Sequence, residues 1–104
     1  MAKLTDEELE AFISNTEGWT SQGDAIVKDF AFPGFRAAIA FVNQVAERAD
    51  ADRHHPDTEI HYNHVRISLS THDAGGVTEK DVAAAAGIDA AAEGDAGSAG
   101  PAGG

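Results

Sequence analysis

The sequence contains no cysteine and no long apolar run. The absence of cysteine excludes disulfide bonds, thiolate metal sites and a nucleophilic thiol. No segment approaches the roughly 20 apolar residues that a membrane helix needs. Residues 1–8 also lack the apolar stretch of a signal peptide. We therefore expect a cytoplasmic protein that does not bind membranes.

Basic residues are scarce: 7 Lys and Arg stand against 18 Asp and Glu, for a formal net charge of −11 at pH 7. Binding to nucleic acid depends on Lys and Arg contacts to phosphate, so this charge argues against nucleic acid as a partner. Few lysines with abundant Asp and Ala are typical of proteins from halophilic organisms, although an ordinary acidic protein is the alternative. Because salt screens the repulsion between like charges, a halophilic protein would gain stability with salt.

The length of 104 residues predicts one domain, and a domain this small favours oligomerisation. From about residue 90 the composition is reduced to Ala, Gly, Asp, Glu, Ser and Pro. Such a segment buries too little apolar surface to offset its loss of conformational entropy. The sequence therefore predicts a domain over residues 1–89 and a disordered tail over residues 90–104.

Local patterns in the first half predict a helix, two strands and a second helix. Thr5 and Glu8 have the spacing of a capping box at the start of the first helix, which ends near residue 15. Strands over residues 19–22 and 25–32 flank a turn that contains Gly23. The apolar positions of the second helix recur with a period near 3.6 and are Phe35, Ala38, Ile39, Val42, Val45 and Ala46.

The second half predicts a loop, two more strands and a last helix. Pro56 disfavours the helical conformation at the preceding residue and so places residues 53–56 in a loop. Strands are expected over residues 58–62 and 64–72, and Thr78 is the expected N-cap of a last helix. The order helix, two strands, helix, two strands, helix predicts an α+β fold, with an antiparallel sheet and helices packed on one face.

All five histidines lie between residues 54 and 72. Histidine exchanges protons near neutral pH because its ordinary pKa is roughly 6.5. Taken singly, each has a plainer interpretation: His61 and His64 as surface residues on strands, His54 and His55 as part of a polar loop, and His72 as a residue where a strand meets a loop. Their clustering in one segment is what indicates chemistry.

A metal site is one interpretation of this cluster, because Asp50, Asp52, Asp57 and Asp73 lie near the histidines and imidazole with carboxylate suits zinc or nickel. Two arguments oppose it. Adjacent His54 and His55 do not readily point at one ion. His61 and His64 are expected on strand positions of opposite parity.

The spacing of these residues resembles a known signature. Asp50, the triplet His54-His55-Pro56, the pair Tyr62-Asn63, the triplet Ser70-Thr71-His72 and Asp81 stand as they do in the pterin-4a-carbinolamine dehydratases. The segment HHPDTEIHYNHVRISLSTHDAGGVTEKD carries most of this resemblance, which extends over residues 4–89. Thr58 departs from the pattern, because the animal members have an aromatic residue there.

The resemblance implies a four-stranded antiparallel sheet and a homodimer or homotetramer. It also implies a pterin substrate and a dehydration that needs no cofactor and no metal. Three family histidines correspond to His54, His55 and His72. We predict that His54 and His72 share the acid and base roles and that His55 binds substrate.

The signature also contains two carboxylates. Asp50 could orient an imidazole from behind the site or be an ordinary residue at a helix end. Asp81 is expected to be a structural residue in the first turn of the last helix. A pterin-site fold that serves as a non-catalytic binding module is the remaining alternative.

Overall fold

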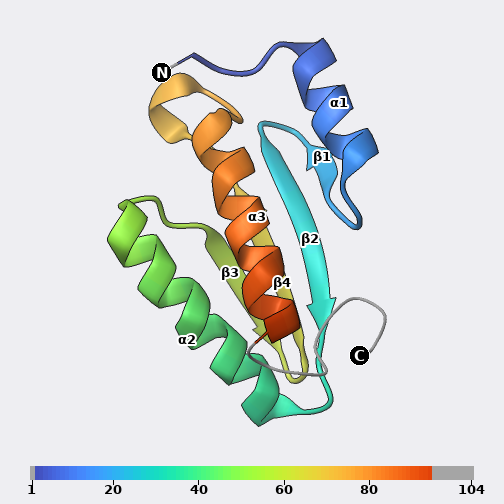
Figure 1. Ribbon diagram of the computed structural model, residues 1–104, viewed down its shortest axis with the longest axis vertical. Coiled ribbons are helices and arrows are strands. Elements are labelled where there is room, and N and C mark those ends of the chain that lie inside the picture. Colours follow the sequence, from blue (N-terminus) through green and yellow to red (C-terminus); the bar gives the residue numbers. More distant parts are fainter. Residues whose placement is uncertain (1, 95–104) are drawn as a thin grey trace.

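Three helices and a four-stranded antiparallel sheet make up residues 2–94, the part of the chain that the computed structural model describes. The strands lie in the order β1-β2-β4-β3, and the helices cover one face of the sheet (Figure 1). The elements are α1 (Asp6–Asn15), β1 (Thr20–Gln22), β2 (Ala25–Ala31), α2 (Phe35–Asp52), β3 (Asp57–His61), β4 (His64–Leu69), a short 3-10 turn η1 (His72–Ala74) and α3 (Glu79–Gly94). The predicted α+β fold and its order of elements are confirmed.

The predicted capping box begins α1. The Thr5 side chain accepts a hydrogen bond of 3.1 Å from the Glu8 backbone N–H, and the Glu8 carboxylate accepts one of 2.9 Å from the Thr5 N–H. These two bonds satisfy backbone donors that the first helical turn leaves without partners. The apolar side of α1 is half-buried against the core and consists of Leu9, Phe12 and Ile13.

The two central strands supply the core face of the sheet. Ile26 and Phe30 of β2 are fully buried, as are Val65 and Ile67 of β4, in agreement with the alternation in the sequence. The opposite face carries polar groups, where Arg66 donates two hydrogen bonds to Asp29 at 2.9 and 3.2 Å. The hydrogen bond and negative charge of Asp29 raise the pKa of Arg66 above its ordinary value.

The buried side of α2 differs from the predicted apolar stripe. Ala38 and Val45 are buried as expected, but Phe41 and Ala49 complete the buried set. Phe41 packs against Phe30 with ring centroids 4.8 Å apart, whereas Phe35 at the start of α2 is 49% exposed. The start of α2, where Phe35 stands, lies beyond the end of the sheet, and this exposes its ring (Figure 1).

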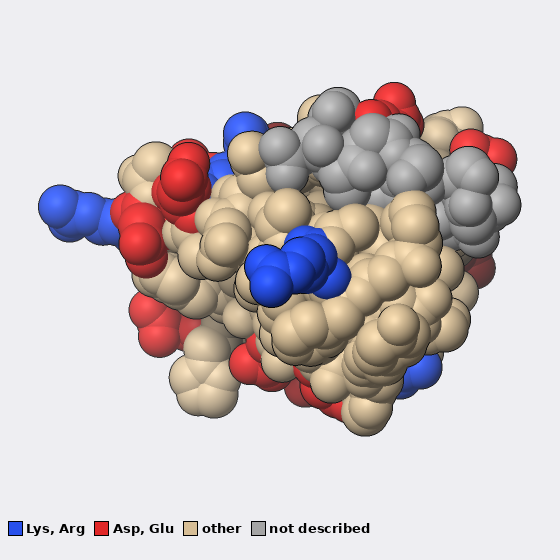
Figure 2. Space-filling model, turned by 90° about the horizontal axis from the view of Figure 1, so that it is seen from below, with Lys and Arg blue, Asp and Glu red and all other residues tan. Residues whose placement is uncertain are grey.

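The exposed Phe35 stacks instead on Tyr62, with ring centroids 6.5 Å apart and planes 11° apart. Ile60 on β3 is also exposed, which gives this end of the molecule three exposed large apolar side chains. Seen from below, the face is largely uncharged, with a basic side chain near its middle and acidic groups scattered around it (Figure 2).

A two-residue turn at Tyr62 and Asn63 joins β3 to β4 and makes His61 and His64 direct cross-strand partners. Directly opposed residues of an antiparallel pair lie on the same face of the sheet. The expectation that these two histidines have opposite parity was therefore wrong, because the hairpin turn reverses the chain between them. Asn63 fixes the turn by donating a 2.8 Å hydrogen bond to the Phe32 carbonyl.

Helix α3 continues to Gly94, so the domain boundary predicted at residue 89 falls inside it. Ala92, beyond that boundary, is a buried core residue. The remainder of the predicted tail, residues 95–104, lies outside the described residues. Within residues 2–94, no helix has both the length and the apolar character needed to cross a membrane.

A buried ion pair connects α3 to the hairpin of β1 and β2. The Lys28 ammonium, only 6% exposed, lies 2.7 Å from Oδ1 of Asp89, and the Trp19 indole donates a 3.0 Å hydrogen bond to Oδ2. The ammonium also lies 4.8 Å from the centroid of the Phe30 ring. Because one carboxylate satisfies two buried donors, Asp89 holds the C-terminal half of α3 in place.

Replacing Asp89 with alanine is expected to lower the free energy of unfolding by about 2–3 kcal/mol, because it leaves a buried ammonium and an indole N–H without an acceptor. Urea denaturation at fixed pH measures this change. Glu93→Ala, an exposed change on the same helix, should stay within about 0.5 kcal/mol of the wild type. Equal stability of Asp89→Ala and the wild type would contradict the role given to the ion pair.

Candidate active site

The end of α2 delivers the first two motif histidines. Arg53 closes the helix in the left-handed conformation, with φ 54° and ψ 41°, and its N–H bonds to the Ala49 carbonyl. A residue other than glycine adopts this conformation at an energetic cost. His54 follows at once, and its own N–H bonds to Ala49 at 3.1 Å. Pro56 then keeps His55 extended, so the two imidazoles leave the chain in different directions.

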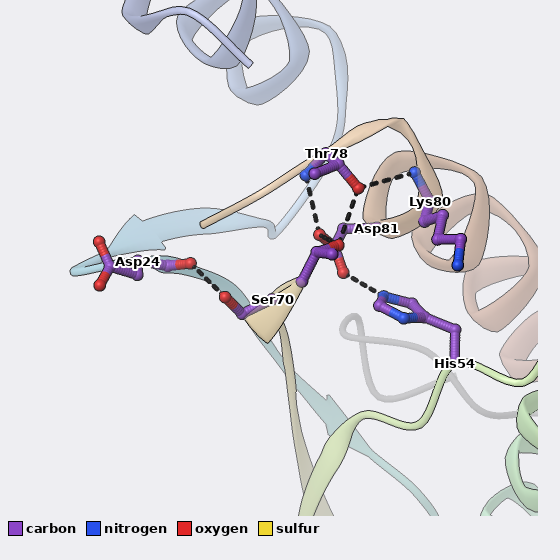
Figure 3. A network of polar contacts seen from close by, with 7 residues as sticks. Asp24, His54, Ser70, Thr78, Lys80 and Asp81 are labelled. Carbon is purple, nitrogen blue, oxygen red and sulfur yellow. Dashed lines mark hydrogen bonds and ion pairs between the residues drawn. The ribbon is translucent and has the colours of Figure 1, made fainter. Parts of the chain in front are cut away.

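His54 points toward the start of α3, where Asp81 is completely buried (Figure 3). Its Nε2 lies 2.5 Å from Oδ1 of Asp81. The other carboxylate oxygen, Oδ2, accepts hydrogen bonds from the Thr71 hydroxyl at 2.8 Å and the Thr78 backbone N–H at 2.9 Å. Both oxygens are therefore occupied, as a buried carboxylate requires.

Thr78 caps α3 as predicted, since its hydroxyl accepts a 3.2 Å hydrogen bond from the Lys80 N–H. Asp81 occupies the third helical position and completes the cap by accepting from Thr78. Asp81 thus has the structural role that the sequence predicted, in the first turn of α3. The same carboxylate also holds an imidazole, which the sequence interpretation did not assign to it.

The contact with Asp81 fixes the orientation of His54, whose side chain is only 13% exposed. Because an ionised carboxylate only accepts hydrogen bonds, an imidazole that donates to it through Nε2 leaves Nδ1 free to accept a proton when the ring is neutral. A carboxylate behind an imidazole selects the tautomer and stabilises the protonated ring. The Asp81 contact thus occupies Nε2 of His54 and fixes the plane of its ring.

His72 is the first residue of η1, which follows β4. Its neighbour Thr71 bonds to the Gly76 carbonyl through the backbone and to Asp81 through the hydroxyl. The chain of contacts from His54 through Asp81 to Thr71 therefore ends at the residue next to His72. It connects two motif histidines that are separated by a whole hairpin.

His72 and His55 line one surface hollow of about 300 Å³ at the end of the sheet. This volume lies at the lower end of the range for small-molecule sites. The other residues that line it are Asp24, Ala25, Asp57, Ser68 and Ser70. The Ser70 hydroxyl donates a 2.7 Å hydrogen bond to the Asp24 carbonyl and so ties the floor of the hollow to the β1–β2 turn (Figure 3).

Asp50 pairs with His55 rather than His54: Nε2 of His55 lies 2.9 Å from Oδ1 of Asp50. Both side chains are well exposed, at 63% and 78%. The predicted carboxylate behind an imidazole is thus found at His55. Exposure makes this pair adaptable, whereas the buried Asp81 fixes His54 in one orientation.

The remaining histidines lie elsewhere. His54 itself lines a separate crevice of only about 10 Å³ between α2 and α3. His61 and His64 line a shallow hollow on the helix-free face, together with Asp29, Glu59 and Arg66. Across residues 2–94, no three His, Asp or Glu side chains are placed to share a metal ion. The structure thus brings His55 and His72 to one hollow and links His54 to them through Asp81 and Thr71.

A comparison with protein families and known sequences places these residues in context. The family model described as pterin 4 alpha carbinolamine dehydratase matches residues 2–91. A relative from Thermomicrobium roseum is 51% identical over 85 residues, which cover 82% of this chain and 91% of the relative. One from Gloeobacter violaceus is 53% identical over 92 residues, covering 85% and 100%. Both relatives carry the family's name.

Solved structures agree with this match. The crystal structure of a transcriptional coactivator/pterin dehydratase from Brucella melitensis superimposes with a TM-score of 0.83 at 34% identity, covering 86% of this chain and 97% of that one. A pterin dehydratase-like RuBisCO assembly factor of the alpha-carboxysome has a TM-score of 0.60 at 24% identity, covering 70% and 84%. The second likeness shows the fold alone.

Proposed function

Because the chain belongs to the pterin-4a-carbinolamine dehydratase family, we propose that it dehydrates a 4a-hydroxytetrahydropterin to quinonoid dihydropterin and water. The observation that carries this proposal is the arrangement of the three motif histidines. His55 and His72 share one hollow, and His54 is held by the buried Asp81, which also bonds to the neighbour of His72. A tetrahydropterin recycled after hydroxylation is the source of this substrate in the family.

The reaction needs two proton transfers and no change of oxidation state. One group protonates the hydroxyl on C4a, which leaves as water as the C4a–O bond breaks. Another removes the proton from N5, and that electron pair forms the C4a=N5 double bond. Positioned acids and bases contribute about 10²–10⁴-fold to such a step. Imidazole suits both tasks near neutral pH.

We assign these transfers to His54 and His72. The Asp81 carboxylate supports His54, since it stabilises a positive imidazolium after proton uptake. His72 lines the hollow and is exposed, so a bound substrate could reach it. Either one can begin as the acid, because each returns to its starting state when a proton passes to or from water. His55, oriented by Asp50, binds the substrate.

A dehydratase assay tests the proposal. The carbinolamine is generated in the cuvette by a phenylalanine hydroxylase working on a tetrahydropterin, and quinonoid dihydropterin is followed by its absorbance. Purified protein should accelerate its formation well above the spontaneous rate, and without added metal. A rate equal to the spontaneous one would favour a non-catalytic binding module, and a rate that appears only with zinc or nickel would favour a metal enzyme.

His55→Ala is expected to raise KM about tenfold, the worth of one hydrogen bond to substrate, and to change kcat by less than about threefold. The reason is that His55 lines the hollow but has no buried carboxylate to support proton transfer. Initial rates over a range of substrate concentrations separate the two constants. A loss confined to kcat would instead place His55 among the proton-transfer groups.

We further propose a homodimer or homotetramer in the cytoplasm. The edge strand β3 is exposed along its whole length and offers unpaired backbone groups to another strand. Ile60 on this strand and the stacked pair Phe35 and Tyr62 add exposed apolar surface at the same end. A second copy would bury both features.

The gain of stability with salt that is expected of a halophilic protein also remains a prediction.

Sedimentation equilibrium at micromolar concentration is expected to give at least twice the chain mass of 10.8 kDa. Ile60→Lys should shift the equilibrium toward the monomer, because it places a charge on the exposed strand. Lys80→Ala, an exposed change far along the chain on α3, should leave the mass unchanged. A wild-type protein that sediments as a monomer would contradict the proposal.

A further inference from the structure

The hollow that holds His55 and His72 has an acidic wall. None of its seven lining residues, all within the described chain, is Lys or Arg, whereas two are Asp. The others that can form hydrogen bonds are the hydroxyls of Ser68 and Ser70 and the imidazoles. A hollow of this composition favours a ligand edge that donates hydrogen bonds over one that carries negative charge.

Only one of the two acidic side chains in the lining faces the interior of the hollow. Asp24 presents its backbone carbonyl to Ser70, while its carboxylate points to the opposite side (Figure 3). Asp57 begins β3 opposite Ser68 of β4, so the two side chains lie on the same, helix-free face. The Asp57 carboxylate is therefore the acceptor that faces the hollow beside a hydroxyl.

Asp57 is also not engaged by the protein. The aspartates that pair with a basic side chain among residues 2–94 are Asp29, Asp50, Asp52, Asp81 and Asp89. Asp57 is not in that set, and it is exposed at the start of an edge strand. An acceptor with this placement is available to a ligand without first breaking an internal contact.

A pterin has one edge that fits such an acceptor. Its pyrimidinone ring presents the 2-amino group and N3–H side by side, two parallel donors with the spacing that a carboxylate accepts in bidentate fashion. This edge lies on the far side of the bicycle from N5 and C4a, where the proton transfers occur. A carboxylate at the wall can thus bind the pyrimidinone edge while His72, which lines the same hollow, meets the reacting atoms.

We propose that Asp57 is a specificity-determining residue that accepts hydrogen bonds from the 2-amino group and N3–H of the pterin. This inference rests on the proposed function, because it takes the hollow to be the pterin site. It restricts the substrate class to 2-amino-4-oxo pteridines and excludes 2-oxo pteridines, whose O2 would face the carboxylate. It requires nothing of the C6 substituent.

Calorimetric titration with 7,8-dihydropterin and with 7,8-dihydrolumazine, its 2-oxo counterpart, tests the inference on the full chain without turnover. The wild type should bind dihydropterin about 10- to 100-fold more tightly, the range for a hydrogen bond to a charged group. Asp57→Asn and Asp57→Ser should both reduce this preference to less than about threefold. Glu59→Gln, two residues along the same face of β3, should keep the wild-type preference.

The outcomes separate this inference from the dehydratase proposal. A wild type that prefers dihydropterin through Asp57 but shows no turnover would overturn the dehydratase and keep Asp57 as the pterin contact. Turnover with an unchanged preference in both Asp57 variants would overturn the Asp57 assignment alone. Equal binding of the two probes by the wild type, or no binding of dihydropterin, would also overturn it.

Discussion

Replacing His72 or His54 with alanine is expected to lower kcat by about 10²–10⁴-fold, the contribution of one positioned acid or base. Under the proposed assignment, each change removes a group that exchanges a proton with the reacting atoms, so KM should change far less. In energy this loss is about 3–5 kcal/mol of transition-state stabilisation. Initial rates, corrected for the spontaneous reaction, measure it.

The two variants differ in their expected stability. His72 is exposed at the start of η1, so His72→Ala should melt as the wild type does. His54→Ala removes one of the three partners of the buried Asp81 and should cost about 1–2 kcal/mol. Both proteins should remain folded by circular dichroism at the assay temperature.

His61→Ala and His64→Ala are the matched controls, because they remove an imidazole from the helix-free face outside the hollow. Both should keep nearly full activity. If the His54 and His72 variants also keep it, the assignment of the proton-transfer pair is wrong. If the control variants lose as much, the effect belongs to the sheet and not to the site.

Asp81→Asn is expected to lower kcat by about 10²-fold, because an amide no longer selects the His54 tautomer or stabilises its protonated form. The amide retains one acceptor, so α3 can stay capped, but one buried contact is lost at a cost of about 1–3 kcal/mol. KM should change by less than about threefold, because Asp81 is fully buried and cannot touch substrate.

The split between kcat and KM distinguishes positioning from general damage to the fold. Glu79→Gln, an exposed change in the same helical turn, should leave both constants unchanged. Loss of stability in Asp81→Asn with full kcat would show that the carboxylate serves only as a helix cap. That outcome would restore the purely structural interpretation that the sequence favours.

Local patterns predicted the elements of this fold because each carries its own signal. The capping box of Thr5 and Glu8, the alternation in β2 and β4 and the loop before Pro56 all appear where their residues indicate. The buried side of α2 was only partly predictable. Periodicity gives the direction of an apolar stripe, but where the sheet ends decides that Phe35 is exposed and Phe41 is buried.

The site required tertiary information. The spacing of the motif identified His54, His55 and His72. It could not show that His54 is hydrogen-bonded to Asp81, which lies 27 positions further along the chain. A carboxylate in the first turn of a helix has an ordinary capping role, so its second role emerges only when the loop and the helix meet. The appearance of Asp81 in the motif at fixed spacing was the one signal that pointed to it.

The central claim is that histidine proton transfer accelerates the dehydration, and one comparison tests it most directly. The rate of quinonoid dihydropterin formation is measured for the wild type and for the double variant His54→Ala/His72→Ala, each against the spontaneous reaction. The account predicts strong acceleration by the wild type, and a double variant that loses no more than the more damaged single variant, as for two groups that act as one unit. A double variant that accelerates the reaction as well as the wild type would contradict it.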